Sequence, residues 1–156
     1  MTKFEENEEI GRNLFESFVD QLNKHTDWNP TEINDCLDGF LQQDDIKVAV
    51  EIKTRNKYYE KYSTYWMELD KYLNIKNRIK GEHCKSVWYV NFFDNDSMYI
   101  FDFRNIIVSN LRIVNKFVLK STVAPERGYQ WKQFIELPRN YASYYKFEKT
   151  KWRKVS

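Results

Sequence analysis

The stretch that decides how this chain folds reads Val48-Ala49-Val50-Glu51-Ile52-Lys53-Thr54-Arg55. Apolar residues alternate along it with the others, which is the period of a β-strand. Alternation places the Glu51 carboxylate and the Lys53 ammonium on one face of that strand. Charged groups among apolar neighbours are costly to bury unless they are paired or bind a ligand. A divalent metal ion and a phosphate would be such ligands, whereas a salt bridge on a solvated face is the alternative.

A turn composition, Gln43-Asp44-Asp45, precedes this strand and predicts a hairpin with residues 33–42. If Asp44 and Asp45 form a two-residue loop, counting outward along the two strands places Asp38 opposite Glu51. Carboxylates about 5 Å apart repel each other unless a cation lies between them. Oxygen ligands so arranged favour Mg²⁺, which keeps several waters and accepts a substrate phosphate. Asp35 is the rival ligand, and a β-bulge would be needed to bring it into register.

Hydrophobic periodicity predicts further helices and strands along the chain. We expect helices over residues 7–24, 57–80, 105–114 and the segment after Pro138. We expect strands over residues 33–42, 46–54, 86–93, 98–103, 116–123 and 128–137, with a hairpin turn at 94–97. This order predicts an α/β fold in which a mixed central β-sheet is flanked by helices.

Length and composition favour one soluble, cytoplasmic domain. The chain has 156 residues, 42% of them apolar, and few glycines and prolines, which excludes low-complexity classes. Cys36 and Cys84 lack metal-ligand spacing and are typical of reduced thiols. No apolar run approaches the roughly 20 residues that span a bilayer. The many Lys, Asn and Ile residues indicate an AT-rich genome, such as that of a phage or a low-GC bacterium.

Net charge is only +2, so the overall charge of the chain does not indicate that it binds nucleic acid. Basic residues nevertheless gather among aromatic ones from Tyr144 to Lys154. This C-terminal segment suits contact with phosphates, and a solvated surface is the equal alternative.

Asp38 followed by Glu51-Ile52-Lys53 resembles the motif of the PD-(D/E)xK nuclease superfamily, which has the restriction-endonuclease-like fold. The expected order helix, strand, strand, helix, strand is similar to that family's core over residues 7–103, with 104–156 as a C-terminal elaboration. The resemblance implies a Mg²⁺-dependent nuclease, with Mn²⁺ as a substitute, that hydrolyses phosphodiester bonds of DNA. No proline precedes Asp38, where the family motif has one. The triplet Asp45-Ile46-Lys47 has the same form but falls in the predicted turn.

The resemblance also implies roles for individual residues. Asp38, Glu51 and the backbone carbonyl of Ile52 would bind the metal, and Lys53 would position the attacking water. Glu16 lies where this family often has a glutamate on its first helix, and it would help to hold a second metal.

Three further cations lie near the motif. Arg55 and Lys57 follow it directly and would contact the nucleic-acid backbone. Lys71 falls on the polar face of the expected long helix, and we assign it no role.

Two other functions stay open. The same fold could be a catalytically inactive module that binds nucleic acid or a protein. Alternatively, the chain could be an unrelated α/β interaction protein in which Glu51 and Lys53 form only a salt bridge. The sequence indicates no organic cofactor and no membrane partner, and it allows a homodimer.

Overall fold

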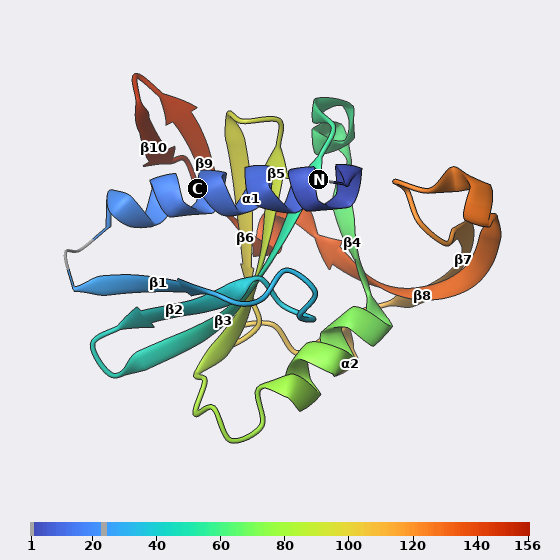
Figure 1. Ribbon diagram of the computed structural model, residues 1–156, viewed down its shortest axis with the longest axis horizontal. Helices are drawn as coiled ribbons and strands as arrows, with labels where there is room; N and C mark the ends of the chain where they lie inside the picture. Colours follow the sequence, from blue (N-terminus) through green and yellow to red (C-terminus); the bar gives the residue numbers. More distant parts are fainter. Residues whose placement is uncertain (1, 23–24) are drawn as a thin grey trace.

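The computed structural model describes residues 2–22 and 25–156 as two β-sheets with helices packed against them (Figure 1). The α-helices are α1 (Lys3–Asp20) and α2 (Leu69–Arg78). The strands are β1 (Thr26–Pro30), β2 (Gly39–Gln43), β3 (Ile46–Arg55), β4 (Thr64–Glu68), β5 (Ser86–Phe93), β6 (Ser97–Asp102), β7 (Ile113–Leu119), β8 (Tyr129–Pro138), β9 (Ser143–Glu148) and β10 (Lys151–Lys154). Short 3₁₀-helices are η1 (Lys57–Lys61), η2 (Val108–Asn110), η3 (Pro125–Arg127) and η4 (Arg139–Tyr141).

The larger sheet has the strand order β1-β2-β3-β5-β6-β9-β10 and the smaller one β4-β8-β7. Strand β3 lies centrally, antiparallel to β2 and parallel to β5. The elements α1, β2, β3, α2 and β5 follow the expected helix-strand-strand-helix-strand order, with β1 and β4 inserted. The mixed α/β class with a central mixed sheet flanked by helices is therefore confirmed.

The predicted β2–β3 register is confirmed. Gln43 pairs with Ile46, and Gly39 pairs with Val50, where the ladder ends. Asp44 adopts a left-handed backbone conformation with φ 53°, which aspartate tolerates in tight turns. Because a slip of one residue would turn every β3 side chain to the opposite face, this turn determines which side of the sheet carries Glu51.

Helix α1 covers one face of the larger sheet. It begins with a capping box between Thr2 and Glu5, and its buried residues include Phe15 and Phe18, which pack in a cluster with the even-numbered side chains of β3. Gly11 permits this close approach, because a Cβ there would lie 2.9 Å from Cγ2 of Ile52. Helix α1 thus covers the apolar face of β3.

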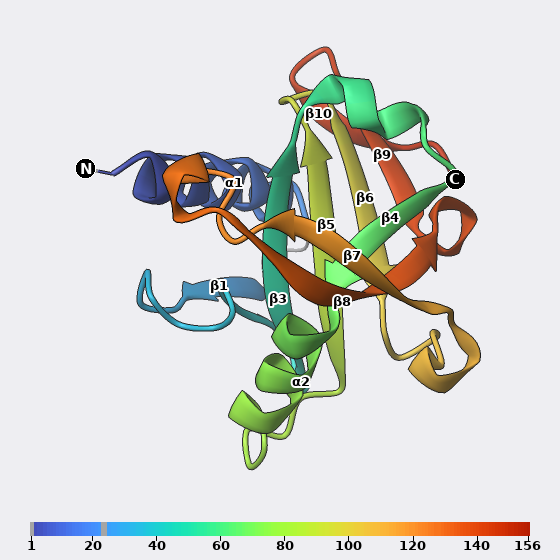
Figure 2. The same ribbon diagram turned by 90° about the vertical axis from the view of Figure 1, so that its right-hand side faces the viewer.

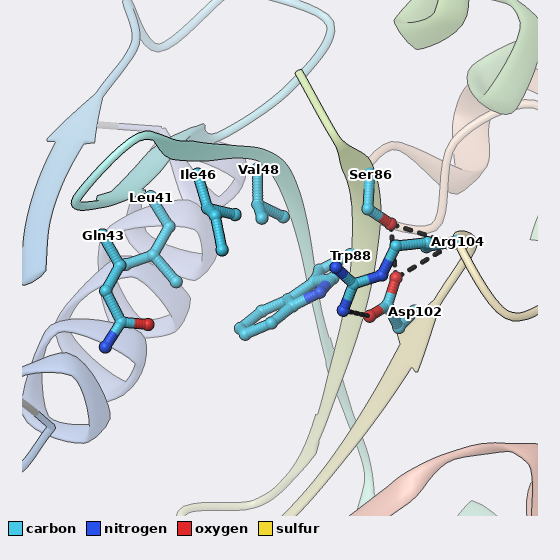
Figure 3. Close-up of a pocket in the computed structure, with 8 residues that line it drawn as sticks. All are labelled: Leu41, Gln43, Ile46, Val48, Ser86, Trp88, Asp102 and Arg104. Atoms are coloured by element: carbon cyan, nitrogen blue, oxygen red, sulfur yellow. Dashed lines mark hydrogen bonds and ion pairs between the residues drawn. The ribbon is translucent and has the colours of Figure 1, made fainter.

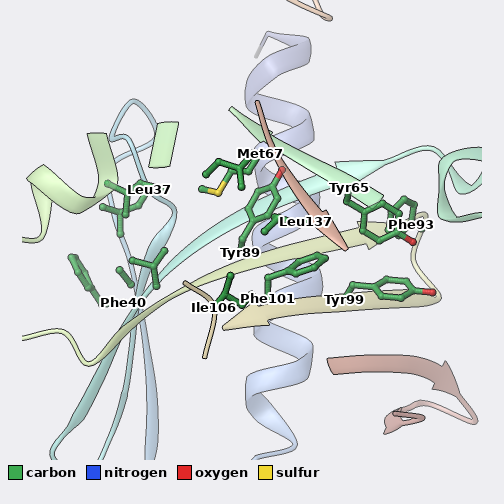
Figure 4. Close-up of a cluster of buried hydrophobic side chains, with 14 residues drawn as sticks. Leu37, Phe40, Tyr65, Met67, Tyr89, Phe93, Tyr99, Phe101, Ile106 and Leu137 are labelled. Atoms are coloured by element: carbon green, nitrogen blue, oxygen red, sulfur yellow. The ribbon is translucent and has the colours of Figure 1, made fainter. Parts of the chain in front are cut away.

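Helix α2 and the smaller sheet cover the opposite face. Their side chains form a second cluster (Figure 4) that includes Leu37, Phe40, Ala49, Tyr65, Met67, Ile75, Tyr89, Phe93, Tyr99, Phe101, Ile135 and Leu137. Ala49 is the β3 member of this cluster, and alternation places Glu51 and Lys53 on the same face further along the strand. The two charged residues therefore lie at the edge of an apolar core.

Strands β7 and β8 cross in front of β3 and β5 in Figure 2, and both views place their connecting loop on the side where α1 begins. No helix in the described ranges 2–22 and 25–156 combines the length and apolar character needed to cross a bilayer.

Several expected elements were wrong. Residues 57–80 form η1, β4 and α2 instead of one helix, because β4 pairs along its whole length with β8. The segment after Pro138 forms η4 and the β9–β10 hairpin instead of a helix. Residues 33–38 are not part of a strand, and α1 ends at Asp20 rather than at 24; residues 23–24 lie outside the described residues.

The remaining predictions are close. Strands at 86–93 and 98–103 correspond to the antiparallel pair β5 and β6. Those at 116–123 and 128–137 correspond to β7 and β8, although β7 begins at Ile113 and ends at Leu119. The expected short helix at 105–114 is wrong except for the three residues of η2.

Candidate functional site

Asp38 lies just before β2 and is only 5% exposed. Its amide donates to the Val50 carbonyl at 2.9 Å, which extends the hairpin by one backbone bond. Beyond this bond, the Asp38 side chain makes the contacts. Oδ2 accepts from the Ile52 amide at 2.7 Å, and Oδ1 accepts from Arg12 Nε at 3.1 Å. The carboxylate is thus fixed beside the backbone of the motif residues.

Glu51 is 8% exposed, and its Oε1 lies 3.1 Å from Nζ of Lys71 on α2. Burial raises the pKa of Glu51 to about 8, although the Lys71 ammonium lowers it in part. Repulsion from the Asp38 and Glu8 carboxylates adds to the rise of this pKa. The two acids, one within β3 and one just before β2, therefore interact electrostatically, as the register predicts.

Lys53 is exposed to solvent at the end of the site, although enough protein surrounds its ammonium to matter electrostatically. Desolvation lowers the pKa of Lys53, and the Arg55 guanidinium lowers it further. The Glu68 and Glu51 carboxylates act in the opposite direction on this pKa. Lys53 is thus a reachable cation within the field of Glu51.

The Ile52 backbone faces Asp38. Within a strand, the N–H and C=O of one residue point to the same side. Because the Ile52 amide donates to Asp38, its carbonyl points to the same side, beyond the end of the β2 ladder. The Ile52 side chain packs toward Gly11 of α1 on the other face of the sheet. A carbonyl oxygen is therefore presented next to the two carboxylates.

Three residues of this site had no role in the sequence prediction: Glu8, Arg12 and Lys71. Arg12 Nη1 donates to the Thr31 carbonyl at 2.6 Å, which anchors the guanidinium that holds Asp38. Glu8 Oε2 is buried without a hydrogen-bond partner and lies 3.9 Å from Arg12 Nη2. Burial, with repulsion from Asp38, raises the pKa of Glu8. The spacing of Glu8 and Arg12 by four residues on α1 was the available sequence signal.

The structure does not bring Glu16 to this group. It is exposed two turns further along α1 than Glu8, and among the described residues the partners of Asp38 and Glu51 are Arg12, the Ile52 amide and Lys71 rather than Glu16. Two turns correspond to about 11 Å along the helix axis. Glu8, rather than Glu16, is the glutamate of α1 whose charge acts on Asp38 and Glu51.

Arg55 and Lys57 are engaged by the protein itself. Arg55 donates to the Asn91 amide oxygen at 2.6 Å, to the Trp66 carbonyl at 2.8 Å and to the Tyr89 hydroxyl at 2.9 Å. Lys57 Nζ pairs with Asp96 at 2.7 Å and with Glu60 at 2.9 Å. Both cations thus have partners that a nucleic-acid phosphate would have to displace.

The donors at this site fit a hard divalent cation. Asp38, Glu51 and the Ile52 carbonyl offer oxygen ligands, the type that Mg²⁺ and Mn²⁺ prefer. The orphaned Glu8 Oε2 and the raised Glu51 pKa indicate carboxylate charge that is incompletely compensated. Within the described part of the chain, no three His, Cys, Asp or Glu side chains converge on one point. The carbonyl and waters would therefore complete the coordination.

A hollow lies at the other end of β3, where that strand begins (Figure 3). It is lined by Leu41, Gln43, Ile46, Val48, Ser86, Trp88, Asp102 and Arg104. Its one carboxylate, Asp102, is bonded by Ser86 Oγ and by the Arg104 amide, at 2.9 Å from the latter. This hollow holds no pair of acids and no lysine among its lining residues, so it lacks the arrangement found at Asp38 and Glu51.

No protein-family model matches the sequence, and the search of curated proteins gives no match. Among solved structures, the chain is similar to Hjc of Archaeoglobus fulgidus, a Holliday junction resolvase from an archaeal hyperthermophile. The TM-score is 0.47 and the identity 10%, over 85% of this chain and 88% of that one. A likeness at this level carries no conclusion about function, which has to be argued from the site.

Proposed function

We propose that this protein is a metal-dependent nuclease that hydrolyses phosphodiester bonds of DNA. The observation that supports this most is the meeting of Asp38, Glu51 and Lys53 at one end of β3, with both carboxylates buried and the lysine exposed. A structural ion pair does not require a second buried acid whose charge raises the pKa of the first. The choice of DNA rests on the resemblance to the PD-(D/E)xK superfamily.

Each residue has a proposed task. Asp38, Glu51 and the Ile52 carbonyl would hold Mg²⁺, which when bound lowers the pKa of water and neutralises charge on phosphorus. Lys53 would donate hydrogen bonds to the attacking water or to a non-bridging phosphate oxygen, since the residue is exposed at the end of the site. The Asp38 orientation depends on Arg12 and the Ile52 amide.

Lys71 serves as the resident counter-ion of Glu51. Its side chain is 38% exposed, whereas that of Glu51 is 10% exposed, so the long lysine stem is free to swing aside toward solvent. We propose that Lys71 leaves Glu51 when a metal ion binds and then contacts a substrate phosphate. We give no direct phosphate contact to Arg55 or Lys57, because both are held by protein acceptors.

The test is cleavage of supercoiled plasmid and of branched DNA in Mg²⁺, in Mn²⁺ and in EDTA. The wild type is expected to nick or cut only with a metal ion and to leave 5′-phosphate ends, the product that the resemblance implies. Glu51→Gln should abolish this activity, and Glu9→Gln, an exposed neighbour of Glu8 on α1, serves as the matched control. Equal activity of wild type and Glu51→Gln would contradict the proposal.

A second candidate is a module on the same fold that binds nucleic acid without cleaving it. One observation favours it: Arg12 and Lys71 already pair with the two carboxylates at 3.1 Å each, so the site can be neutralised without a metal. This alternative predicts DNA binding with no metal-dependent cleavage of any substrate, and no heat of Mn²⁺ binding in calorimetry.

A further inference from the structure

The hairpin of β7 and β8 carries three large aromatic side chains in solvent. Phe117 is 57% exposed, Tyr129 is 58% exposed and Trp131 is 70% exposed. Phe117 pairs with Trp131 across the hairpin. The Phe117 ring lies 5.5 Å from that of Tyr129 at an interplanar angle of 15°, and 5.4 Å from that of Trp131. We call these three residues the hairpin patch.

The hairpin patch lies on the inner face of the smaller sheet. Because side chains alternate along a strand, Tyr129 and Trp131 share a face of β8 with Ile135 and Leu137. The latter two are fully buried in the core that separates the two sheets. The face of β8 that packs into the core thus continues into solvent as the hairpin patch. This face lies on the side of the larger sheet that carries Glu51.

The hairpin patch also adjoins the candidate site. Trp131 and Lys132 line a hollow together with Glu68 and Asp70, at the junction of β4 and α2. Lys132 Nζ lies 2.8 Å from Glu68 Oε1. Glu68 in turn is one of the carboxylates whose charge acts on Lys53. The hollow beside Trp131 therefore lies within electrostatic reach of the motif lysine.

The charge of the β7–β8 hairpin indicates which kind of partner can bind to the hairpin patch. Between residues 111 and 132 the chain carries the cations Arg112, Lys116, Lys120, Arg127 and Lys132 against the single acid Glu126. Alternation places Arg112, Lys116, Lys120 and Lys132 on the face of the hairpin opposite the three rings, so the hairpin is basic as a whole rather than on the patch itself. A second copy that docked on the rings would bring two such basic hairpins together, which is unfavourable. Exposed rings on a hairpin of net positive charge suit a single nucleic-acid strand, whose bases stack on the rings while the cations attract its phosphates.

We propose that Phe117, Tyr129 and Trp131 form a stacking platform for unpaired bases, so that the substrate of the Asp38–Glu51 site is a nucleic acid with a single-stranded segment. The platform holds that segment while the neighbouring backbone enters the site past Glu68. The substrate assignment rests on the proposed nuclease function, whereas binding to the platform does not.

The experiment measures binding of fluorescently labelled dT15 and of a 15-base-pair duplex in EDTA, where cleavage has no part. Trp131→Ala should weaken dT15 binding by about ten- to a hundredfold, the range expected for loss of stacking with one base. Trp131→Phe keeps a ring and should retain most of the affinity. Tyr141→Ala, which removes an exposed aromatic side chain in η4, is the matched control and should bind as the wild type does.

Three results would overturn the platform. The first is unchanged dT15 affinity in Trp131→Ala that is folded by circular dichroism. The second is stronger binding of phosphatidylserine vesicles than of dT15, lost in Trp131→Ala, which would indicate a membrane surface. The third is a wild-type dimer in sedimentation that becomes monomeric in Trp131→Ala, which would indicate contact between copies.

The two proposals can fail separately. If Trp131→Ala loses dT15 binding but no DNA is cleaved in metal, the platform stands and the nuclease function fails. If metal-dependent cleavage occurs and Trp131→Ala binds dT15 normally, the nuclease function stands and the platform fails.

Discussion

Two lysine–glutamate pairs hold β3 to the segment around α2, and their behaviour is opposite. At the start of the strand, Lys47 lies 2.7 Å from Glu82, and both side chains are about a third exposed or somewhat less, at 26% and 35%. Lys47 lowers the pKa of Glu82. Toward the end of the strand, Lys71 lies 3.1 Å from Glu51, and burial raises the pKa of Glu51 to about 8.

The difference follows from what surrounds each carboxylate. Glu82 keeps its hydration, so a neighbouring cation decides the sign of its pKa shift. Glu51 has lost its hydration and has Asp38 and Glu8 nearby, so one lysine does not compensate for the burial. The first pair is an ordinary surface contact, and the second leaves a buried carboxyl group whose ionised form a divalent cation would stabilise.

The largest expected contrast concerns cleavage. Asp38→Asn or Glu51→Gln should lower metal-dependent cleavage of DNA by about a thousandfold or more, because loss of the metal removes several kcal/mol of transition-state stabilisation. Glu82→Gln should stay within about twofold, since exposed pairs contribute little. A plasmid-nicking time course measures all three. A strong loss in Glu82→Gln would remove the distinction between the two pairs.

The two strand lysines should also differ. Lys53→Ala is expected to lower kcat by about a hundredfold or more, as for other groups that position or transfer a proton, with little change in metal affinity. Lys47→Ala, at the other end of β3, should leave kcat unchanged. Single-turnover kinetics at saturating Mn²⁺ separate these effects, and full nicking by Lys53→Ala would remove this residue from the mechanism.

The stability of the metal-free protein should depend on pH in opposite ways at the two pairs. Glu51 binds a proton more tightly when folded, so its favourable contribution is complete below about pH 4.5 and is lost as the pH rises through about 8. Glu82 has a lowered pKa, so its contribution is present above about pH 4.5 and is lost as the pH falls through its folded pKa.

Urea unfolding at pH 5.5 and 8.5 measures the Glu51 contribution. The wild type should lose stability of the order of 3 kcal/mol between these values, and Glu51→Gln should lose much less. Equal pH slopes for wild type and Glu51→Gln would show that Glu51 titrates normally in the folded chain.

The smallest expected effect distinguishes two glutamates of α1. Glu8→Gln should weaken Mn²⁺ binding by about tenfold, the usual effect of losing a group that supports metal ligands, because its carboxylate acts on both Asp38 and Glu51. Glu16→Gln should bind Mn²⁺ as the wild type does, since Glu16 is exposed further along the helix. Isothermal calorimetry gives both affinities, and the reverse ranking would restore Glu16 to the site.

Local sequence was sufficient for the hairpin at the centre of the site. The alternation of Val48, Val50 and Ile52 and the turn at Asp44-Asp45 set the strand, its register and the face that carries Glu51. These features depend on residues close together in the chain, so counting along the hairpin brought Asp38 to the end of the ladder, where its charge acts on Glu51.

Contacts between segments far apart in the sequence could not be predicted in the same way. Tyr58, Tyr65 and Tyr72 share a helical spacing, yet β4 pairs with β8, some 70 residues later, and Tyr65 and Met67 are buried by strand alternation instead. Lys71 falls on a polar helix face in either reading. Lys71 faces Glu51 because α2 begins at Leu69 and packs against the larger sheet, and neither fact could be predicted from the helical spacing.

The central claim is that Asp38 and Glu51 share a divalent cation, and a crystal soaked in Mn²⁺ tests it most directly. We expect an anomalous peak within about 2.0–2.6 Å of an Asp38 oxygen, a Glu51 oxygen and the Ile52 carbonyl, with Lys71 withdrawn from Glu51. An Mn²⁺-soaked crystal in which Lys71 still pairs with Glu51 and no anomalous density lies between the two acids would contradict it.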